Sequence, residues 1–262
     1  MTVAGATHAL ISFAPMIDSE LSRLVLAHYA VAYQEERHLF GVASLVALAR
    51  AAQIQIPVLC GGGLRLAGPR AMVDWFDQTC PAERKLLPSV QPLRSQVEAD
   101  WARFHGRLAT ETAAFAYFHL LPHPNIMMEP LCQGLPPTQA TALRSWAYPP
   151  MRQLLTLLLG LSAARAADAL VRIRIGFDYV DKLLADGRRH IAGERLTLSD
   201  FALASAVAPL LLPAGYGAPT PALETMPNAI ASVIAELRTH PTAAFVQRFY
   251  AGHPPSVQAR PR

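Results

Sequence analysis

The chain of 262 residues contains 52% hydrophobic and 16% charged residues, so it can bury ordinary cores and lacks the composition of a disordered protein. Lysine and arginine exceed aspartate and glutamate, 23 to 19, which gives a formal charge of +4. The arginines are scattered and form no basic stripe interleaved with aromatic side chains. We therefore expect no nucleic-acid partner.

No apolar run approaches the roughly 20 residues that a membrane-spanning helix needs. The N-terminus lacks the basic start and continuous apolar stretch of a secretory signal. The 3 cysteines are far apart and have no metal-ligand spacing, which favours reduced thiols. These features predict a cytoplasmic protein with no membrane span and no metal site.

The first elements alternate between strands and helices. Residues 9–14 predict a buried strand. From Asp18 onward, apolar residues recur three and four positions apart, which predicts a helix with Asp18 or Ser19 at its N-cap. Residues 31–37 predict a second strand and residues 42–52 a second helix.

The next stretch predicts a hairpin followed by a third helix. Two apolar runs flank a turn of three glycines within residues 56–66. Gly68 starts the helix, and Pro69 suits its first turn, where a backbone N–H is not needed. Pro57 lies where the first strand of the hairpin begins, so it occupies a strand edge or end, or its peptide bond is cis. The predicted order is βαβαββα.

A proline-rich linker divides the chain. We expect residues 1–80 to form an α/β domain, residues 81–93 to be the linker, and residues 94–253 to form an all-helical domain. The polar, proline-containing end, residues 254–262, is predicted to be a disordered tail.

The second half shows helical periodicity only. A long helix is predicted over residues 94–121, an irregular segment over 125–134, and further helix with one break over 151–185. Thr197 and Asp200 have the spacing of a capping box. The helix that follows them is apolar nearly all round, which predicts a buried central helix.

Together these features resemble the glutathione transferase family. The motifs that carry the resemblance are IPVL at residues 56–59, LxLxxxRAMVDWFD at 64–77 and LTLSDFALA at 196–204, and the likeness extends over about residues 9–253. It implies an α/β thioredoxin-like N-terminal domain followed by an all-α C-terminal domain. It also implies a homodimeric cytoplasmic enzyme that uses glutathione as a co-substrate.

The start of the first helix carries the predicted catalytic residue. Where thioredoxins have two cysteines this chain reads SELS, residues 19–22, and dithiol exchange needs a thiolate, so a disulfide oxidoreductase is excluded here. In serine-type transferases a hydroxyl at this place donates to the glutathione sulfur. Aligning on Arg23 puts Ser19 there. The alternative is that Ser19 only caps the helix.

The resemblance also implies where glutathione is held. The backbone N–H and C=O of Ile56, before Pro57, would bind its cysteine part as an added strand does. The third helix of the family usually starts with an acidic residue and a serine that hold the γ-glutamyl group, but this chain has Gly68 and Pro69. Two hydrogen bonds are thereby lost, and Arg70 with the helix N-terminus is the remaining partner for the carboxylate.

The main hypothesis is a detoxifying transferase. Its glutathione thiolate would attack a small apolar electrophile bound against the helical domain. Aromatic side chains between Trp101 and Phe118 are candidates for that pocket or, alternatively, for the core. His119 and His123 lack a third ligand at suitable spacing, so no metal site is predicted there.

Two alternatives remain open because of Gly68 and Pro69. The chain could be a binding or structural protein of this fold that has lost glutathione. It could also be an enzyme of this fold that acts on a different thiol or on none.

Overall fold

The computed structural model describes residues 8–254, so nearly all of the predicted tail, residues 254–262, lies outside the described part. Its first half contains the expected seven elements in the expected order. The strands are β1 (His8–Ser12), β2 (Tyr33–Arg37), β3 (Val58–Gly61) and β4 (Leu64–Ala67), and the helices are α1 (Ile17–His28), α2 (Val42–Ala51) and α3 (Gly68–Phe76).

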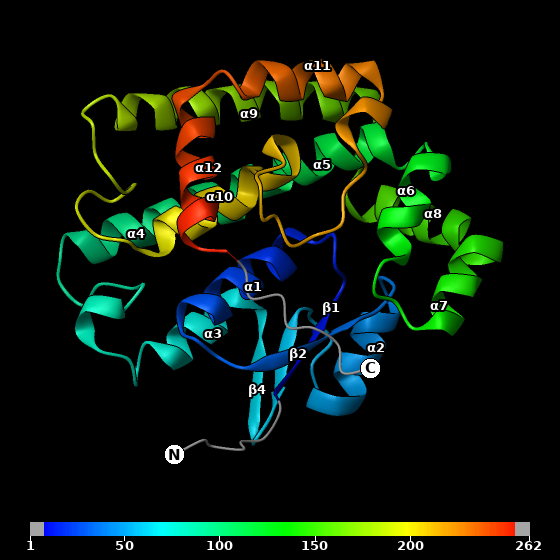
Figure 1. Ribbon diagram of the computed structural model, residues 1–262, viewed down its shortest axis with the longest axis horizontal. Coiled ribbons are helices and arrows are strands. Elements are labelled where there is room, and N and C mark those ends of the chain that lie inside the picture. Colours follow the sequence, from blue (N-terminus) through cyan, green and yellow to red (C-terminus); the bar gives the residue numbers. More distant parts are fainter. Residues whose placement is uncertain (1–7, 255–262) are drawn as a thin grey trace.

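The four strands form one mixed sheet in the order β2-β1-β3-β4. β1 and β2 are parallel, whereas β3 is antiparallel to both β1 and β4. Helices α1 and α3 pack against each other on one side of the sheet, toward the helical domain, and α2 lies on the other side (Figure 1). This is the thioredoxin-like arrangement that the sequence predicts.

Three chain segments meet at one end of the strands β1, β3 and β4. Ile11 pairs with Val58, and Val58 pairs with Ala67. The end of β1, the start of β3 and the end of β4 therefore lie side by side. Pro57 precedes β3 through a cis peptide bond, and its carbonyl accepts a hydrogen bond of 2.8 Å from the N–H of Gly68. The starts of α1 and α3 are consequently neighbours of the cis-proline loop.

The second half is helical throughout the described residues. Its helices pack around α10, which contacts α1 of the first domain as well as α4, α5, α11 and α12 (Figure 1). The elements are η1 (Ala82–Arg84), α4 (Leu93–Trp101), η2 (Ala102–Leu108), α5 (Ala109–Leu120), α6 (Pro124–Cys132), α7 (Pro137–Ala142), η3 (Leu143–Ala147), α8 (Tyr148–Leu158), α9 (Ala163–Leu184), α10 (Leu198–Leu211), η4 (Leu223–Thr225), α11 (Asn228–Leu237) and α12 (Pro241–Gly252).

Helix α10 is the buried centre of this domain, as its apolar sequence predicts. All of its residues except Pro209 are buried. The capping box is present: Oδ2 of Asp200 accepts from the backbone N–H of Thr197 at 2.8 Å, and Oδ1 accepts from Ile191 at 2.9 Å. Because Asp200 satisfies two buried N–H groups, the helix can begin inside the core.

Two local predictions were wrong. The segment predicted to be irregular, residues 125–134, contains helix α6, because Pro124 occupies the first helical turn, where its missing N–H is not needed. The N-cap of α1 is Met16, so neither Asp18 nor Ser19 caps that helix. The N–H of Met16 bonds to the carbonyl of Phe13, and this turn starts the helix earlier than its apolar spacing indicates.

The long helix predicted over residues 94–121 is continuous, with π-helical geometry at η2 between α4 and α5. The predicted break in residues 151–185 falls between α8 and α9. Among the described residues, no single helix is long and apolar enough to span a membrane. Residues 137–158 and 163–184 meet that test only as a pair, bent by 61°.

Candidate functional site

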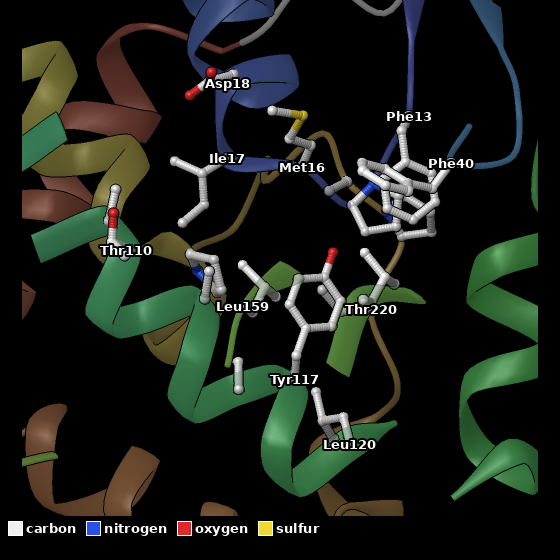
Figure 2. A pocket seen from close by; sticks show the side chains of 18 of the residues that line it. Phe13, Met16, Ile17, Asp18, Phe40, Thr110, Tyr117, Leu120, Leu159 and Thr220 are labelled. Carbon is white, nitrogen blue, oxygen red and sulfur yellow. The ribbon is translucent and has the colours of Figure 1, made fainter. Parts of the chain in front are cut away.

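An apolar cavity of about 470 Å³ lies between the two domains. The turn from β1 into α1 forms one wall, the η2 and α5 helices form another, and the segment after α10 forms a third (Figure 2). Representative apolar lining residues are Phe13, Phe40, Leu120, Met127, Leu155 and Leu159. None of its described lining residues is a lysine or an arginine.

The first turn of α1 faces this cavity. Met16, Ile17 and Asp18 line it. The backbone N–H groups of Ile17 and Asp18 make no hydrogen bond to another backbone group in the described part of the chain. Unpaired N–H groups at a helix N-terminus carry partial positive charge, so this wall favours a bound anion.

Ser19 follows directly but does not line the cavity. Its side chain is fully buried, and its hydroxyl donates to the backbone oxygen of Phe13 at 2.8 Å. In this arrangement the hydroxyl fixes the turn between β1 and α1. Contact with a ligand sulfur would require Ser19 to give up that bond, so its catalytic role stays a prediction.

The cis-proline loop keeps a free backbone edge. The side chain of Ile56 is buried, but its N–H and C=O form no backbone hydrogen bond with the residues that the structure describes. An extended ligand could use these two groups as an additional strand does. The loop lies beside the start of α1, because β1 and β3 are antiparallel neighbours.

The start of α3 offers fewer groups to a ligand. The N–H of Gly68 is used by Pro57, and Pro69 has none. Gly68 has a φ of +77°, and a side chain there would start 3.2 Å from Nε2 of Gln55. An acidic side chain at this position would therefore be strained.

Arg70 is already paired in this structure. Its guanidinium contacts Glu98 of α4 at 2.7 Å and Asp74, one turn along α3, at 3.0 Å. These hydrogen bonds, chiefly the one to Glu98, raise the pKa of Arg70 above its ordinary value. A ligand carboxylate would have to compete with two protein carboxylates, so the predicted role of Arg70 stays a prediction.

A pair of side chains from the two domains borders the cavity. Nε2 of His105, from η2, lies 2.8 Å from Oδ1 of Asp18. The imidazole also stacks on the indole of Trp101, with ring centroids 4.0 Å apart. Sequence reasoning missed this pair, because only the fold brings together residues 87 positions apart.

Tyr117 is the aromatic residue of α5 that reaches the cavity. Figure 2 shows its hydroxyl pointing into the open space, toward the side where Met16 lies. Burial raises the pKa of this phenol, so it keeps its proton. By contrast, Phe104 and Phe115 belong to the core. The predicted aromatic segment thus supplies both core and cavity residues.

Buried charges hold the third wall of the cavity against α1. Arg23 contacts Glu20 and Glu35, each at 2.8 Å. The other oxygen of Glu20 accepts from the backbone N–H of Gly217 at 3.0 Å, and its neighbour Tyr216 lines the cavity. Burial alone would raise the pKa of Glu35, but the charge and hydrogen bonds of Arg23 lower it. Glu35 therefore stays ionised beside Arg23 at neutral pH.

No group of three or more histidine, cysteine, aspartate or glutamate side chains within residues 8–254 could hold a metal ion. Ile56 and Pro57 do not line the cavity, but both the cavity and the cis-proline loop lie at the start of α1.

The sequence matches no protein-family model and no curated protein. Solved structures do share its fold. A glutathione S-transferase from Rhodospirillum rubrum has a TM-score of 0.57 and 18% identity, over 92% of this chain and 91% of that chain. A glutathione S-transferase from Methylobacterium radiotolerans, in complex with glutathione sulfonate, has a TM-score of 0.57 and 18% identity over 98% of each chain. FzlA from C. crescentus has a TM-score of 0.53 and 18% identity over 96% of each chain.

These likenesses cover both domains, and they agree with the strand order and the all-helical second half. At such identities they establish the fold and not the activity. The chain therefore has the glutathione transferase fold, an α/β thioredoxin-like domain followed by an all-α domain.

Proposed function

We propose that this protein conjugates the thiolate of glutathione to a small apolar electrophile, as a cytoplasmic homodimer. The observation that carries the proposal is that the apolar cavity meets the unpaired N–H groups of Ile17 and Asp18. An anionic sulfur at that point would be stabilised by the helix N-terminus. An electrophile in the cavity would lie next to it, shielded from water.

The thiolate has two candidate sources of stabilisation. The N–H groups at the start of α1 are available without rearrangement. The Ser19 hydroxyl would act only after exchanging its bond to Phe13 for one to the sulfur. Either donor would favour the thiolate, which is the nucleophilic form, over the thiol at neutral pH.

The tripeptide would be held mainly by its cysteine part. Ile56 next to the cis Pro57 offers the N–H and C=O that would pair with it. The γ-glutamyl end has less support, because Pro69 lacks a donor and Arg70 is paired with Glu98. We therefore expect glutathione to bind in the millimolar range rather than the micromolar range.

The second candidate is a ligand-binding protein of the same fold without transferase activity. The commitment of Arg70 to Glu98 and Asp74 is the observation that favours it. Such a protein would bind an apolar ligand in the cavity but would bind no thiol.

Calorimetric titration separates the two candidates. The transferase proposal predicts saturable heat with millimolar glutathione. It also predicts formation of a glutathione conjugate from an apolar electrophile at a rate above the uncatalysed one. Absence of heat with glutathione, together with heat on titration of an apolar ligand, would instead establish the second candidate. Light scattering of the same samples tests the expected homodimer.

A further inference from the structure

We propose that the outer side of η3 and α8 binds peripherally to an anionic lipid bilayer. Four apolar residues form this surface, which we call the α8 face: Trp146, Pro150, Leu154 and Leu157. Helix α8 lies at the outer edge of the helical domain (Figure 1). The proposal concerns the outside of the molecule and does not depend on the proposed function.

The α8 face is both apolar and exposed. Trp146 is 68% exposed, Leu157 is 72% exposed and Leu154 is 42% exposed, and Pro150 is exposed as well. The four residues follow one another at intervals of four, four and three positions, so they lie along one side of the helix. Contact of this much apolar surface with water is unfavourable, so the face favours a partner that covers it.

The opposite side of α8 is already part of the core. Tyr148, Met151 and Leu155 are buried there. The hydroxyl of Tyr148 donates to the backbone carbonyl of Leu121 at 2.8 Å. A rotation of α8 that turned its exposed leucines inward would break this hydrogen bond and expose the buried residues. The α8 face therefore stays on the surface of the folded protein.

The charges around this face are positive. Residues 130–167 contain no aspartate, glutamate or lysine, and their charged residues are Arg144, Arg152 and Arg165. Arg144 lies 3.5 Å from Glu129, and Arg165 contacts Glu111. Arg152 is exposed and forms no ion pair with any described residue. The net charge of the whole chain, +4, has the same sign.

Arg152 is placed to reach lipid phosphates. It follows the buried Tyr148 by four residues, so it lies at the flank of α8, close to the body of the protein. When an interfacial helix inserts its apolar side chains into the acyl region, its cationic side chains lie at the level of the head groups. Arg152 would occupy that level if Trp146 and Leu157 entered the bilayer.

An anionic bilayer fits this combination better than a second copy of the chain does. Tryptophan and leucine favour the boundary between head groups and acyl chains, and arginine is attracted to anionic lipids. A second copy that used the same face would bring positive charge to positive charge, because residues 130–167 contain no carboxylate. The bilayer supplies both hydrocarbon and negative charge.

Co-sedimentation with lipid vesicles tests the binding. The full chain is mixed with vesicles of phosphatidylcholine alone or of phosphatidylcholine and phosphatidylglycerol, with no thiol present. We expect binding to the anionic vesicles to be about tenfold tighter than to the neutral ones and to weaken as salt is added. Protein that stays in the supernatant with both kinds of vesicle, or that binds both equally well, would overturn the proposal.

Variants test which surface binds. Leu157→Gln should weaken binding to the anionic vesicles by about tenfold, because an apolar side chain is lost from the acyl region. Leu45→Gln is the matched control, because Leu45 is 65% exposed on α2 of the other domain, and it should bind like the wild type. Arg152→Gln should weaken binding to the anionic vesicles alone, by about fivefold. Equal effects of the two leucine substitutions would overturn the assignment to the α8 face. Circular dichroism checks that each variant is folded.

Tryptophan fluorescence tests the orientation. Phosphatidylglycerol with brominated chains quenches a tryptophan that lies among the acyl chains. We expect quenching in the wild type and in Trp75→Phe, whose substituted residue lies on α3, but not in Trp146→Phe. Quenching that persists in Trp146→Phe would mean that another surface meets the bilayer. If Leu157→Gln instead halves the mass measured by light scattering and no vesicles bind, the α8 face is an interface between protein chains and the proposal fails.

Discussion

Nε2 of His105 lies 2.8 Å from Oδ1 of Asp18, and this contact joins the helical domain to the first turn of α1. It places a carboxylate within the same helical turn as the N–H groups proposed to stabilise a thiolate. A bare carboxylate there would repel an anionic sulfur. The hydrogen bond from His105 engages that carboxylate, so the pair joins the two domains and would reduce repulsion at the proposed anion site.

The first prediction concerns this pair. His105→Ala should slow conjugation several-fold, because it leaves the Asp18 carboxylate unpaired beside the thiolate. Adding Asp18→Asn to that variant should restore most of the rate. Urea denaturation of the wild type, the two single variants and the double variant should give a coupling free energy between the two side chains of about 1 kcal/mol or less, because both are about one-fifth exposed. No recovery in the double variant would remove charge repulsion as the cause.

The second prediction concerns Ser19. Ser19→Ala should destabilise the fold by about 0.5 to 1.5 kcal/mol, because the buried carbonyl of Phe13 loses one hydrogen bond but keeps the N–H of Met16 as a donor. Ser22→Ala is the matched control: the Ser22 hydroxyl is buried without a partner, so its removal should cost little or nothing. Denaturant melts measure both. A large fall in kcat for Ser19→Ala would support its predicted catalytic role, whereas an unchanged kcat would leave it only the structural one.

The third prediction concerns the start of α3. Pro69→Ser should strengthen glutathione binding by about tenfold, because it returns a hydroxyl and an N–H to the place of the γ-glutamyl group. Cysteinylglycine, which lacks that group, should bind both proteins alike. Calorimetry measures the affinity of the wild-type protein and of Pro69→Ser for each of the two thiols. A gain with both thiols, or with neither, would show that the γ-glutamyl group does not bind at this helix.

The fourth prediction concerns pH. The pKa of Glu35 is lowered from 4.5 in the folded protein, so its contribution to stability is complete above that pH and is lost as the pH falls through the lowered value. At neutral pH, Glu35→Gln should cost about 3 kcal/mol, because Arg23 keeps only Glu20 as a charged partner. In urea melts, the difference in unfolding free energy between the wild-type protein and Glu35→Gln should become smaller below pH 4.5. A constant gap would mean that Glu35 is not ionised in the native state.

Much of the fold could be predicted from the sequence, because local rules determine it. Alternating apolar residues, the glycine turn and the position of Pro57 are enough to specify the hairpin, and the spacing of Thr197 and Asp200 predicts the cap of α10. The failures are also local. A helix that starts with a proline, such as α6, looks like a loop when proline is counted only as a breaker.

The site was less predictable, because it depends on contacts between distant residues. Motifs and family resemblance point to Ile56, Pro57 and Ser19 as candidate residues, but they do not show that the Ser19 hydroxyl bonds to the carbonyl of Phe13. The pairing of Arg70 with Glu98 of α4 depends on how the domains pack. The cavity likewise takes its walls from separate parts of the chain, and no short motif marks Tyr117 as the aromatic residue of α5 that lines it.

The central claim is that the N-terminus of α1 stabilises a bound thiolate, and the ultraviolet absorbance of the glutathione thiolate tests it directly. Difference spectra between saturating glutathione with protein and the same glutathione without protein, recorded as a function of pH, give the pKa of the bound thiol. We predict a pKa clearly below that of free glutathione. A bound thiol that ionises at the same pH as the free one, or at a higher pH, would contradict the account.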